Sequence, residues 1–206
     1  IVGYDRVEAV ESVQVDEKWN PIPGTEVVIP CDTMLLSVGL IPENELSRKA
    51  GVLIDPLTGG PFVDDHFETN VPGIFAAGNV VHVYDLVDWV SEAGKEAGKS
   101  AAKFAAHIRR QENSLVPLRA GDNVRYVVPH QMDRETLADS FVRLQLRVKT
   151  PIEKPVWVEV RNRDNLVTRK GEMYARPGEI ITLEIPAKAY DEVQLAEELT
   201  VAVVQR

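Results

Sequence analysis

Alternating apolar and polar positions dominate the second half of the chain. A period of two, typical of half-buried β-strands, recurs in segments 142–148, 156–160, 181–185 and 199–203. Segments 124–128 and 167–174 are also rich in β-branched and aromatic residues. Six or seven short strands separated by turns predict an antiparallel, immunoglobulin-like β-sandwich over residues 117–206.

The first half combines strand patterns with one long helix. Alternation within residues 1–36, interrupted by Pro and Gly near residue 22, predicts a hairpin or meander. Continuous apolar runs at 33–38 and 73–77 are typical of strands buried on both faces. The fold class expected for residues 1–116 is therefore α/β, and the class expected for residues 117–206 is β.

Helical spacing of apolar residues from about Leu86 to Arg110 predicts a long helix, and a turn of helix is expected at 44–50. Asp85 is placed to cap the N-terminus of the long helix. Arg109 and Arg110 would complement the negative end of its dipole.

Charge and composition narrow the function classes. The net charge is −9; residues 1–119 hold 18 acidic against 10 basic side chains, and residues 120–206 hold 14 against 13. Neither half carries the basic field that nucleic-acid binding needs, and no apolar stretch is long enough for a membrane helix. A single cysteine excludes an internal disulfide, and the histidines show no metal-ligand spacing. A cytoplasmic location fits best.

One segment, Thr69-Asn-Val-Pro-Gly-Ile-Phe-Ala-Ala-Gly-Asn79, carries candidate chemistry. An apolar strand ends there in a glycine and a short polar side chain, and a helix begins a few residues later. Glycine allows a ligand to approach the backbone, and Asn79 can hydrogen-bond a hydroxyl. The amides and the positive dipole end of the helix near 85–87 can bind phosphate.

This segment resembles the second FAD-binding motif of the pyridine nucleotide-disulfide oxidoreductase superfamily. Asp32-Thr-Met-Leu-Leu-Ser-Val-Gly-Leu-Ile-Pro-Glu-Asn44 resembles the strand and turn that end the NAD(P)H domain of these flavoproteins, and Phe62-Val-Asp64 the strand before the motif. Ala93-Gly and Ala97-Gly-Lys-Ser-Ala-Ala102 are similar to the helix under the flavin. More specifically, the flanking residues are similar to FAD-dependent oxidoreductases associated with glycerol-3-phosphate enzymes.

The resemblance implies an FAD-dependent enzyme that moves electrons between NAD(P)H and an acceptor. It predicts a Rossmann-like FAD/NAD(P)-binding region that ends within residues 1–116. Residues 1–42 would end the NAD domain, and 60–110 would hold the motif strand and the helix. Asn79 replaces the usual Asp of the motif, which binds the ribityl chain in the family. No residue is identified as an acid–base catalyst, and no metal is expected. The implied cofactor-binding residues are Ala77, Gly78, Asn79, Asp85, Leu86 and Val87.

The Gly-x-Gly-x-x-Gly fingerprint occurs nowhere in the 206 residues. We therefore expect a C-terminal part of a longer enzyme, inactive alone, that binds FAD weakly or not at all and can self-associate. Its partners would be the remaining FAD/NAD(P) regions of the same protein and a dehydrogenase subunit. Alternatively, the sandwich is a docking module for such a dehydrogenase, through an exposed Trp157, or a stabilising appendage. His82 is interpreted as a solvated loop residue.

Overall fold

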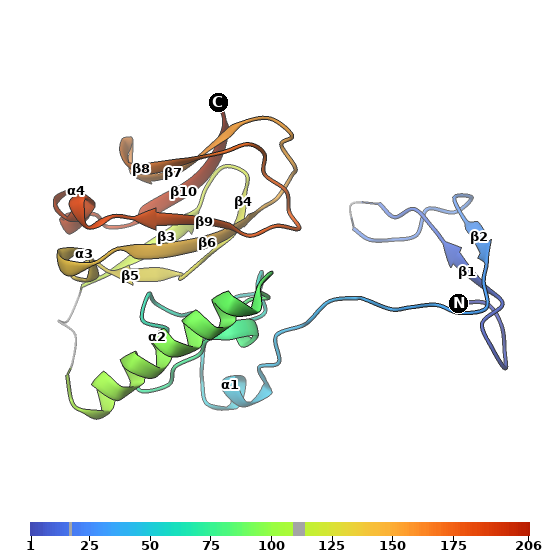
Figure 1. Cartoon of the computed structure of the whole chain (residues 1–206), viewed down its shortest axis with the longest axis horizontal. Coiled ribbons are helices and arrows are strands. Elements are labelled where there is room, and N and C mark those ends of the chain that lie inside the picture. The colour runs from blue at the N-terminus through green and yellow to red at the C-terminus, as the bar shows by residue number, and fades with distance from the viewer. Residues whose placement is uncertain (17, 109–113) are drawn as a thin grey trace. The chain divides into compact units, whose positions relative to one another are not determined.

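The computed structural model describes residues 1–16, 18–108 and 114–206. The chain divides into two compact units, Ile1–Gly39 and Leu40–Arg206. The smaller unit contains a hairpin, and the larger contains the long helix and all the strands from β3 onward (Figure 1).

An antiparallel hairpin forms the sheet of the smaller unit. β1 (Ala9–Ser12) pairs with β2 (Val27–Pro30), which confirms the hairpin predicted within residues 1–36. The buried strand predicted at 33–38 is wrong: these residues form no strand, and Leu35 and Val38 are 92% and 89% exposed. Such a run is buried only where neighbouring strands and covering layers surround it, and this unit supplies only a two-stranded sheet.

Residues 40–108 contain one long helix and few strand pairs. α1 (Glu45–Lys49) and α2 (Val87–Ala105) confirm the two predicted helices. The buried strand predicted at 73–77 is wrong, because Phe75 alone forms an isolated bridge, to Glu68, and residues 73–77 are exposed or half-buried. Turns and isolated single-residue bridges take the place of the predicted strands in this region.

α2 ends at Ala105, not at Arg110 as predicted. The His107 amide donates to the Phe104 carbonyl at 2.9 Å, and the Ile108 amide donates to the Lys103 carbonyl at 3.0 Å. His107 has a φ of 61°. These paired bonds around a left-handed residue are the Schellman motif, which terminates a helix. Arg109 and Arg110, predicted to complement the helix dipole, lie outside the described residues.

Within residues 114–206, eight strands form two sheets, ordered β5-β3-β10-β7-β8 and β4-β6-β9. The strands are β3 (Leu115–Ala120), β4 (Val124–Val128), β5 (Gln131–Asp133), β6 (Val142–Val148), β7 (Val156–Asn162), β8 (Asn165–Glu172), β9 (Ile181–Ile185) and β10 (Leu199–Gln205). Two short helices, α3 (Thr136–Asp139) and α4 (Tyr190–Gln194), and a 3₁₀ turn at Ala187–Ala189 lie in the connections.

The two sheets share one hydrophobic core. Leu144 and Leu146 of β6 and Val158 and Val160 of β7 have no exposed surface and belong to the same buried cluster as Val201 of β10. The alternating residues of each strand therefore place their apolar faces against each other. One pair departs from the antiparallel expectation: β10 runs parallel to β3, with Leu199 opposite Leu118. The five-stranded sheet is therefore mixed, the three-stranded sheet is antiparallel, and the immunoglobulin-like topology stays a prediction.

A third layer covers the outer face of the three-stranded sheet. Val63 and Val81, from the turns before α2, form a second buried cluster with Tyr126 and Val128 of β4. α2 lies beside this sheet (Figure 1). Gln145 points outward from β6 and is nevertheless only 8% exposed. The turns and α2 thus bury polar positions that the strand pattern alone would place in solvent.

Candidate functional site

The predicted cofactor turn contains a glycine that its geometry requires. Ala77 is extended, and Gly78–Val80 forms a 3₁₀ turn in which Gly78 has a φ of +77°. A Cβ on Gly78 would lie 3.1 Å from Cγ1 of Val90, in α2. Gly78 therefore permits both the left-handed backbone and the close approach of the turn to the helix.

Asn79 closes the loop between this turn and the helix. Its Oδ1 accepts a hydrogen bond from the Tyr84 amide at 3.0 Å. The acceptor expected to bind a cofactor hydroxyl is thus occupied within the loop. Asn79 is half-buried, and its Nδ2 has no hydrogen-bond partner among the described residues. A ligand could therefore accept a hydrogen bond from this amide group.

The start of α2 has no side-chain cap. Leu86 occupies the N-cap position with an extended backbone, and its side chain offers no acceptor. Leu86 and Val87 are 52% and 74% exposed. Helix amides without a side-chain acceptor, at the positive end of the dipole, are suited to an anionic group such as phosphate.

Asp85 does not cap the helix, and that prediction is wrong. Its carboxylate pairs with the Arg147 guanidinium on β6, and its Oδ2 accepts a 2.7 Å hydrogen bond from the Ile180 amide. Two donors from the sandwich thus outcompete the helix amides for Asp85. Of the six predicted cofactor residues, Ala77, Gly78 and Asn79 lie in the turn, while Asp85, Leu86 and Val87 lie at the helix start.

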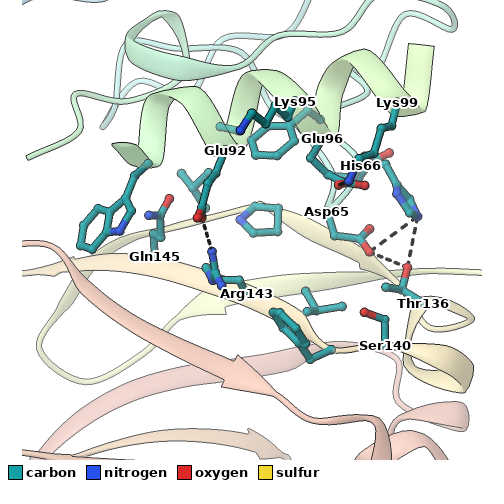
Figure 2. Close-up of a pocket in the computed structure, with 18 of the residues that line it drawn as sticks. Asp65, His66, Glu92, Lys95, Glu96, Lys99, Thr136, Ser140, Arg143 and Gln145 are labelled. Atoms are coloured by element: carbon teal, nitrogen blue, oxygen red, sulfur yellow. Dashed lines mark hydrogen bonds and ion pairs between the residues drawn. The ribbon is translucent and has the colours of Figure 1, made fainter. Parts of the chain in front are cut away.

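A pocket of about 630 Å³ lies between α2 and the outer face of the three-stranded sheet. Figure 2 shows Glu92, Lys95, Glu96 and Lys99 on the helix side and Arg143 and Gln145 on the sheet side. Glu92 pairs with Arg143 at 2.7 Å. None of the six predicted cofactor residues lines this pocket. No sequence pattern indicates this pocket, because its walls come from segments with unrelated periods.

One end of the pocket holds a compact polar cluster, drawn in Figure 2. The Thr136 hydroxyl donates to Asp65 Oδ2 at 2.7 Å and lies 3.1 Å from His66 Nε2. Burial raises the pKa of Asp65 above its usual range. The carboxylate and the hydroxyl both face Nε2, whereas a nucleophilic triad places its carboxylate on Nδ1. This cluster can share a proton but lacks the arrangement that activates a hydroxyl nucleophile.

The interpretation of His82 as a solvated loop residue is wrong. His82 is 1% exposed, and its ring lies between those of Tyr84 and Tyr126, with centroids 4.3 and 5.8 Å away. Its Nε2 lies 3.3 Å from Gln145 Oε1, so the ring proton is assigned to Nε2. Its Nδ1 has no hydrogen-bond partner within the part of the chain that the structure describes. Burial lowers the pKa of His82 to about 4.

Within residues 1–16, 18–108 and 114–206, no helix is both long and apolar enough to cross a membrane. Nor do three or more His, Cys, Asp and Glu side chains in those ranges form a group that could hold a metal ion.

Comparison with known proteins relates the first half of the chain to one family. The model of the pyridine nucleotide-disulphide oxidoreductases matches residues 4–101. Thioredoxin reductase of Listeria monocytogenes is 36% identical over 61 residues, which are 30% of this chain and 18% of that protein. The NADPH glutamate synthase small chain of Mycobacterium tuberculosis is 32% identical over 106 residues, which cover 46% of this chain and 20% of that protein.

A third relative, the NADH oxidase of Methanocaldococcus jannaschii, is 33% identical over 90 residues, covering 42% of this chain and 16% of that protein. The chain thus spans a fifth or less of the length of these three relatives. No solved structure matches the chain.

Proposed function

Residues 4–101 belong to the pyridine nucleotide-disulphide oxidoreductase family, and on that premise we propose that this chain is the C-terminal part of an FAD-dependent enzyme. The enzyme moves electrons between NAD(P)H and an acceptor. Bound FAD supplies the hydride and electron transfer, and the protein supplies binding, orientation and electrostatics. Two of the three relatives carry NADPH or NADH in their names, which supports the nicotinamide assignment.

The observation that carries this proposal is the glycine turn beside an uncapped helix start. Ala77 and Gly78 would let the backbone approach the ribityl region, and Asn79 Nδ2 would donate to it, because Oδ1 already accepts from the Tyr84 amide. The first amides of α2, from Val87 onward and preceded by Leu86 at the N-cap, would present the positive end of the helix dipole to a phosphate. Asp85 supports these groups without touching the cofactor, because Arg147 and Ile180 already occupy its carboxylate.

The site in this chain is one part of a complete FAD site. The 206 residues lack the glycine-rich strand–turn–helix that holds the pyrophosphate in such proteins. We assign that part, and the nicotinamide site, to other regions of the same protein. The domain division proposed is a flavoprotein region over 1–116 and an immunoglobulin-like sandwich over 117–206.

A longer polypeptide that includes the sequence preceding Ile1 tests the proposal. We expect a Gly-x-Gly-x-x-Gly motif in that sequence and a purified protein with flavin absorbance that NADH or NADPH bleaches. Gly78→Val, which strains the φ of +77° and meets Val90, should lower flavin occupancy. Gly94→Ala, in open space on α2, is the matched control. A longer protein without flavin would contradict the proposal.

The isolated chain gives a second test of the divided site. Added FAD should dissociate from it during dialysis, because the adenosine and pyrophosphate groups find few contacts. A stoichiometric complex that survives dialysis would show that these 206 residues hold a complete site.

Docking of a partner subunit is the second candidate role for the sandwich. One relative is named as a small chain, which supports assembly with a larger subunit. Trp157 is half-buried, with the guanidinium groups of Arg169 and Arg206 at 4.3 and 4.0 Å from its ring centroid. These contacts cover much of the aromatic surface proposed for docking. Trp157→Ala should reduce capture of a dehydrogenase partner by the full chain only if that partner displaces the arginines.

A further inference from the structure

The segment between the cofactor turn and α2 is buried against the outer face of the three-stranded sheet. Val81 and His82 have 0% and 1% of their surface exposed, and Tyr84 has 8%. The segment follows the Gly78–Val80 turn, which contains Asn79, and leads directly to the uncapped start of α2. Its position therefore sets where the two groups proposed to bind FAD lie relative to each other.

Arg147 holds this segment at several points. Its guanidinium pairs with the Asp85 carboxylate and donates to the Val83 carbonyl at 3.2 Å. It also donates to the Tyr126 hydroxyl at 3.0 Å and to the Pro177 carbonyl at 3.4 Å. The Arg147 side chain is 14% exposed. One side chain of β6 thus connects the segment to β4 and to the loop before β9.

The charges at this position are balanced within the structure. Burial, the largest single influence, would lower the pKa of Arg147, but the hydrogen bonds to Asp85 and Tyr126 and the charges of both groups together outweigh burial and raise it. A half-buried guanidinium and carboxylate that share a hydrogen bond depend on each other, because removal of either one leaves the other without the oppositely charged group it pairs with here. The planar guanidinium can reach four acceptors at once, which a lysine ammonium on the same strand cannot do.

We propose that Arg147 is a positioning residue for the flavin site, and that the β-sandwich acts as a clamp that fixes the Gly78–Asn79 turn and the start of α2. The clamp consists of Arg147, Asp85 and the Ile180 amide, with His82 packed beside them against Gln145. This role rests on the proposed function, since the clamp would pre-arrange the groups that bind FAD. It makes the sandwich part of the site and not a separable appendage.

Hydrogen exchange of the FAD-free chain tests the clamp directly. Arg147→Met keeps most of the apolar stem and removes every donor. The hydrogen-bonded amides within 84–90, among them those of Tyr84 and Trp89, should then exchange at least about tenfold faster, while the amides of β7 and β10 keep their rates. Arg147→Lys should give an intermediate rate. Arg163→Ala, which removes an exposed pair with Glu197, is the matched control and should leave 84–90 unchanged.

A double-mutant cycle with Asp85→Asn gives an internal check. The combined Asp85→Asn and Arg147→Met variant should exchange at 84–90 little faster than either single variant, because both changes break the same contact. Unchanged exchange in Arg147→Met would overturn the clamp. A uniform increase over all strands would also overturn it, since that result indicates a general loss of stability.

Flavin affinity in the longer protein then tests the connection to the cofactor. Arg147→Met should weaken FAD binding at least about tenfold, with the lysine variant between it and the unchanged protein. Equal FAD affinity together with faster exchange at 84–90 would overturn the positioning role alone. A longer protein that contains no flavin would instead defeat the proposed function, and the exchange result would still decide whether the clamp exists.

Discussion

The larger unit contains two regions that are built in different ways. Residues 114–206 form two sheets around a core in which many valine and leucine side chains have no exposed surface. Residues 40–108 have one long helix, isolated bridges and few buried apolar side chains, and their second cluster is completed by Tyr126 and Val128 of the sandwich. The two sheets of residues 114–206 bury their own apolar faces, and the preceding region depends on these sheets for its core.

This difference follows from the two kinds of strand pattern. An alternating strand needs one apolar partner face, which a second sheet of the same domain provides. A continuous apolar run needs cover on both faces, and neither 33–38 nor 73–77 finds it in this chain. The region related to the oxidoreductases is therefore the one in which local pattern and observed structure disagree.

The largest expected loss of unfolding free energy comes from the core of residues 114–206, and it contrasts with a small loss in residues 40–108. Leu144→Ala removes a fully buried side chain from the sandwich and should reduce the free energy of unfolding by about 2–5 kcal/mol. Leu46→Ala, at a position 80% exposed in α1, should change it by less than about 0.5 kcal/mol. Guanidinium chloride unfolding measures both. Similar losses in the two variants would contradict the contrast between the regions.

Acid should weaken the junction between the regions through His82. The pKa of His82 is about 4 in the folded chain and about 6.5 in the unfolded chain, so only the unfolded state gains the proton in that interval. Stability should therefore fall as the pH drops below about 6.5. The loss should level off near pH 4, at on the order of 3 kcal/mol.

His82→Gln keeps a donor near Gln145 and removes the titration. In this variant the fall in stability between pH 6.5 and 4 should be smaller by that amount. An identical pH dependence in the two proteins, measured by denaturant unfolding at each pH, would show that His82 is not buried at the junction.

A smaller loss of stability is expected where two turns within residues 40–108, at Gly60 and at Val81, pack against each other. A Cβ on Gly60 would lie 1.8 Å from the Val81 carbonyl oxygen, which is backbone and cannot rotate away. Gly60→Ala should therefore destabilise the chain by about 1–3 kcal/mol or more. Thermal unfolding would show this as a lower midpoint, and a midpoint equal to that of the unchanged chain would mean that the loop is not held against Val81.

The smallest of these expected effects is an increase in stability, whereas Leu144→Ala and Gly60→Ala lower it. Gly94 lies within α2, where a Cβ would meet nothing within 4 Å. Gly94→Ala should stabilise the chain by about 0.5–1 kcal/mol, because glycine loses more backbone entropy in a helix. A lower melting temperature for Gly94→Ala would indicate that this face of α2 contacts another part of the molecule.

Sequence alone predicted the strands that pair with and pack against other alternating strands, and it also predicted the long helix. The alternation in β6, β7, β9 and β10 identified the strands, and helical spacing identified α2. The pocket and the clamp could not be found this way, because Arg143, Gln145 and Arg147 occupy the outward positions of β6 and resemble an ordinary solvated face. Nothing in a strand's own period shows that a distant helix will cover it.

Local reasoning about Asp85 failed for the same reason. A carboxylate just before a helix favours capping, but Arg147 and the Ile180 amide offer it stronger partners from across the fold. Gly78 and Asn79 were predicted to end a strand, and the structure places them in a 3₁₀ turn instead, in which Gly78 adopts the left-handed backbone that favours glycine. Whether the turn binds FAD stays a prediction.

Hydrogen exchange of the unaltered chain, mapped along its whole length, tests the central claim most directly. We expect amides of 33–38 to exchange at unprotected rates and those of β6 to be the most protected, with the hydrogen-bonded amides of 82–90 and α2 protected through their packing on residues 114–206. Protection of 33–38 equal to that of β6, or unprotected exchange throughout 82–105, would contradict the account.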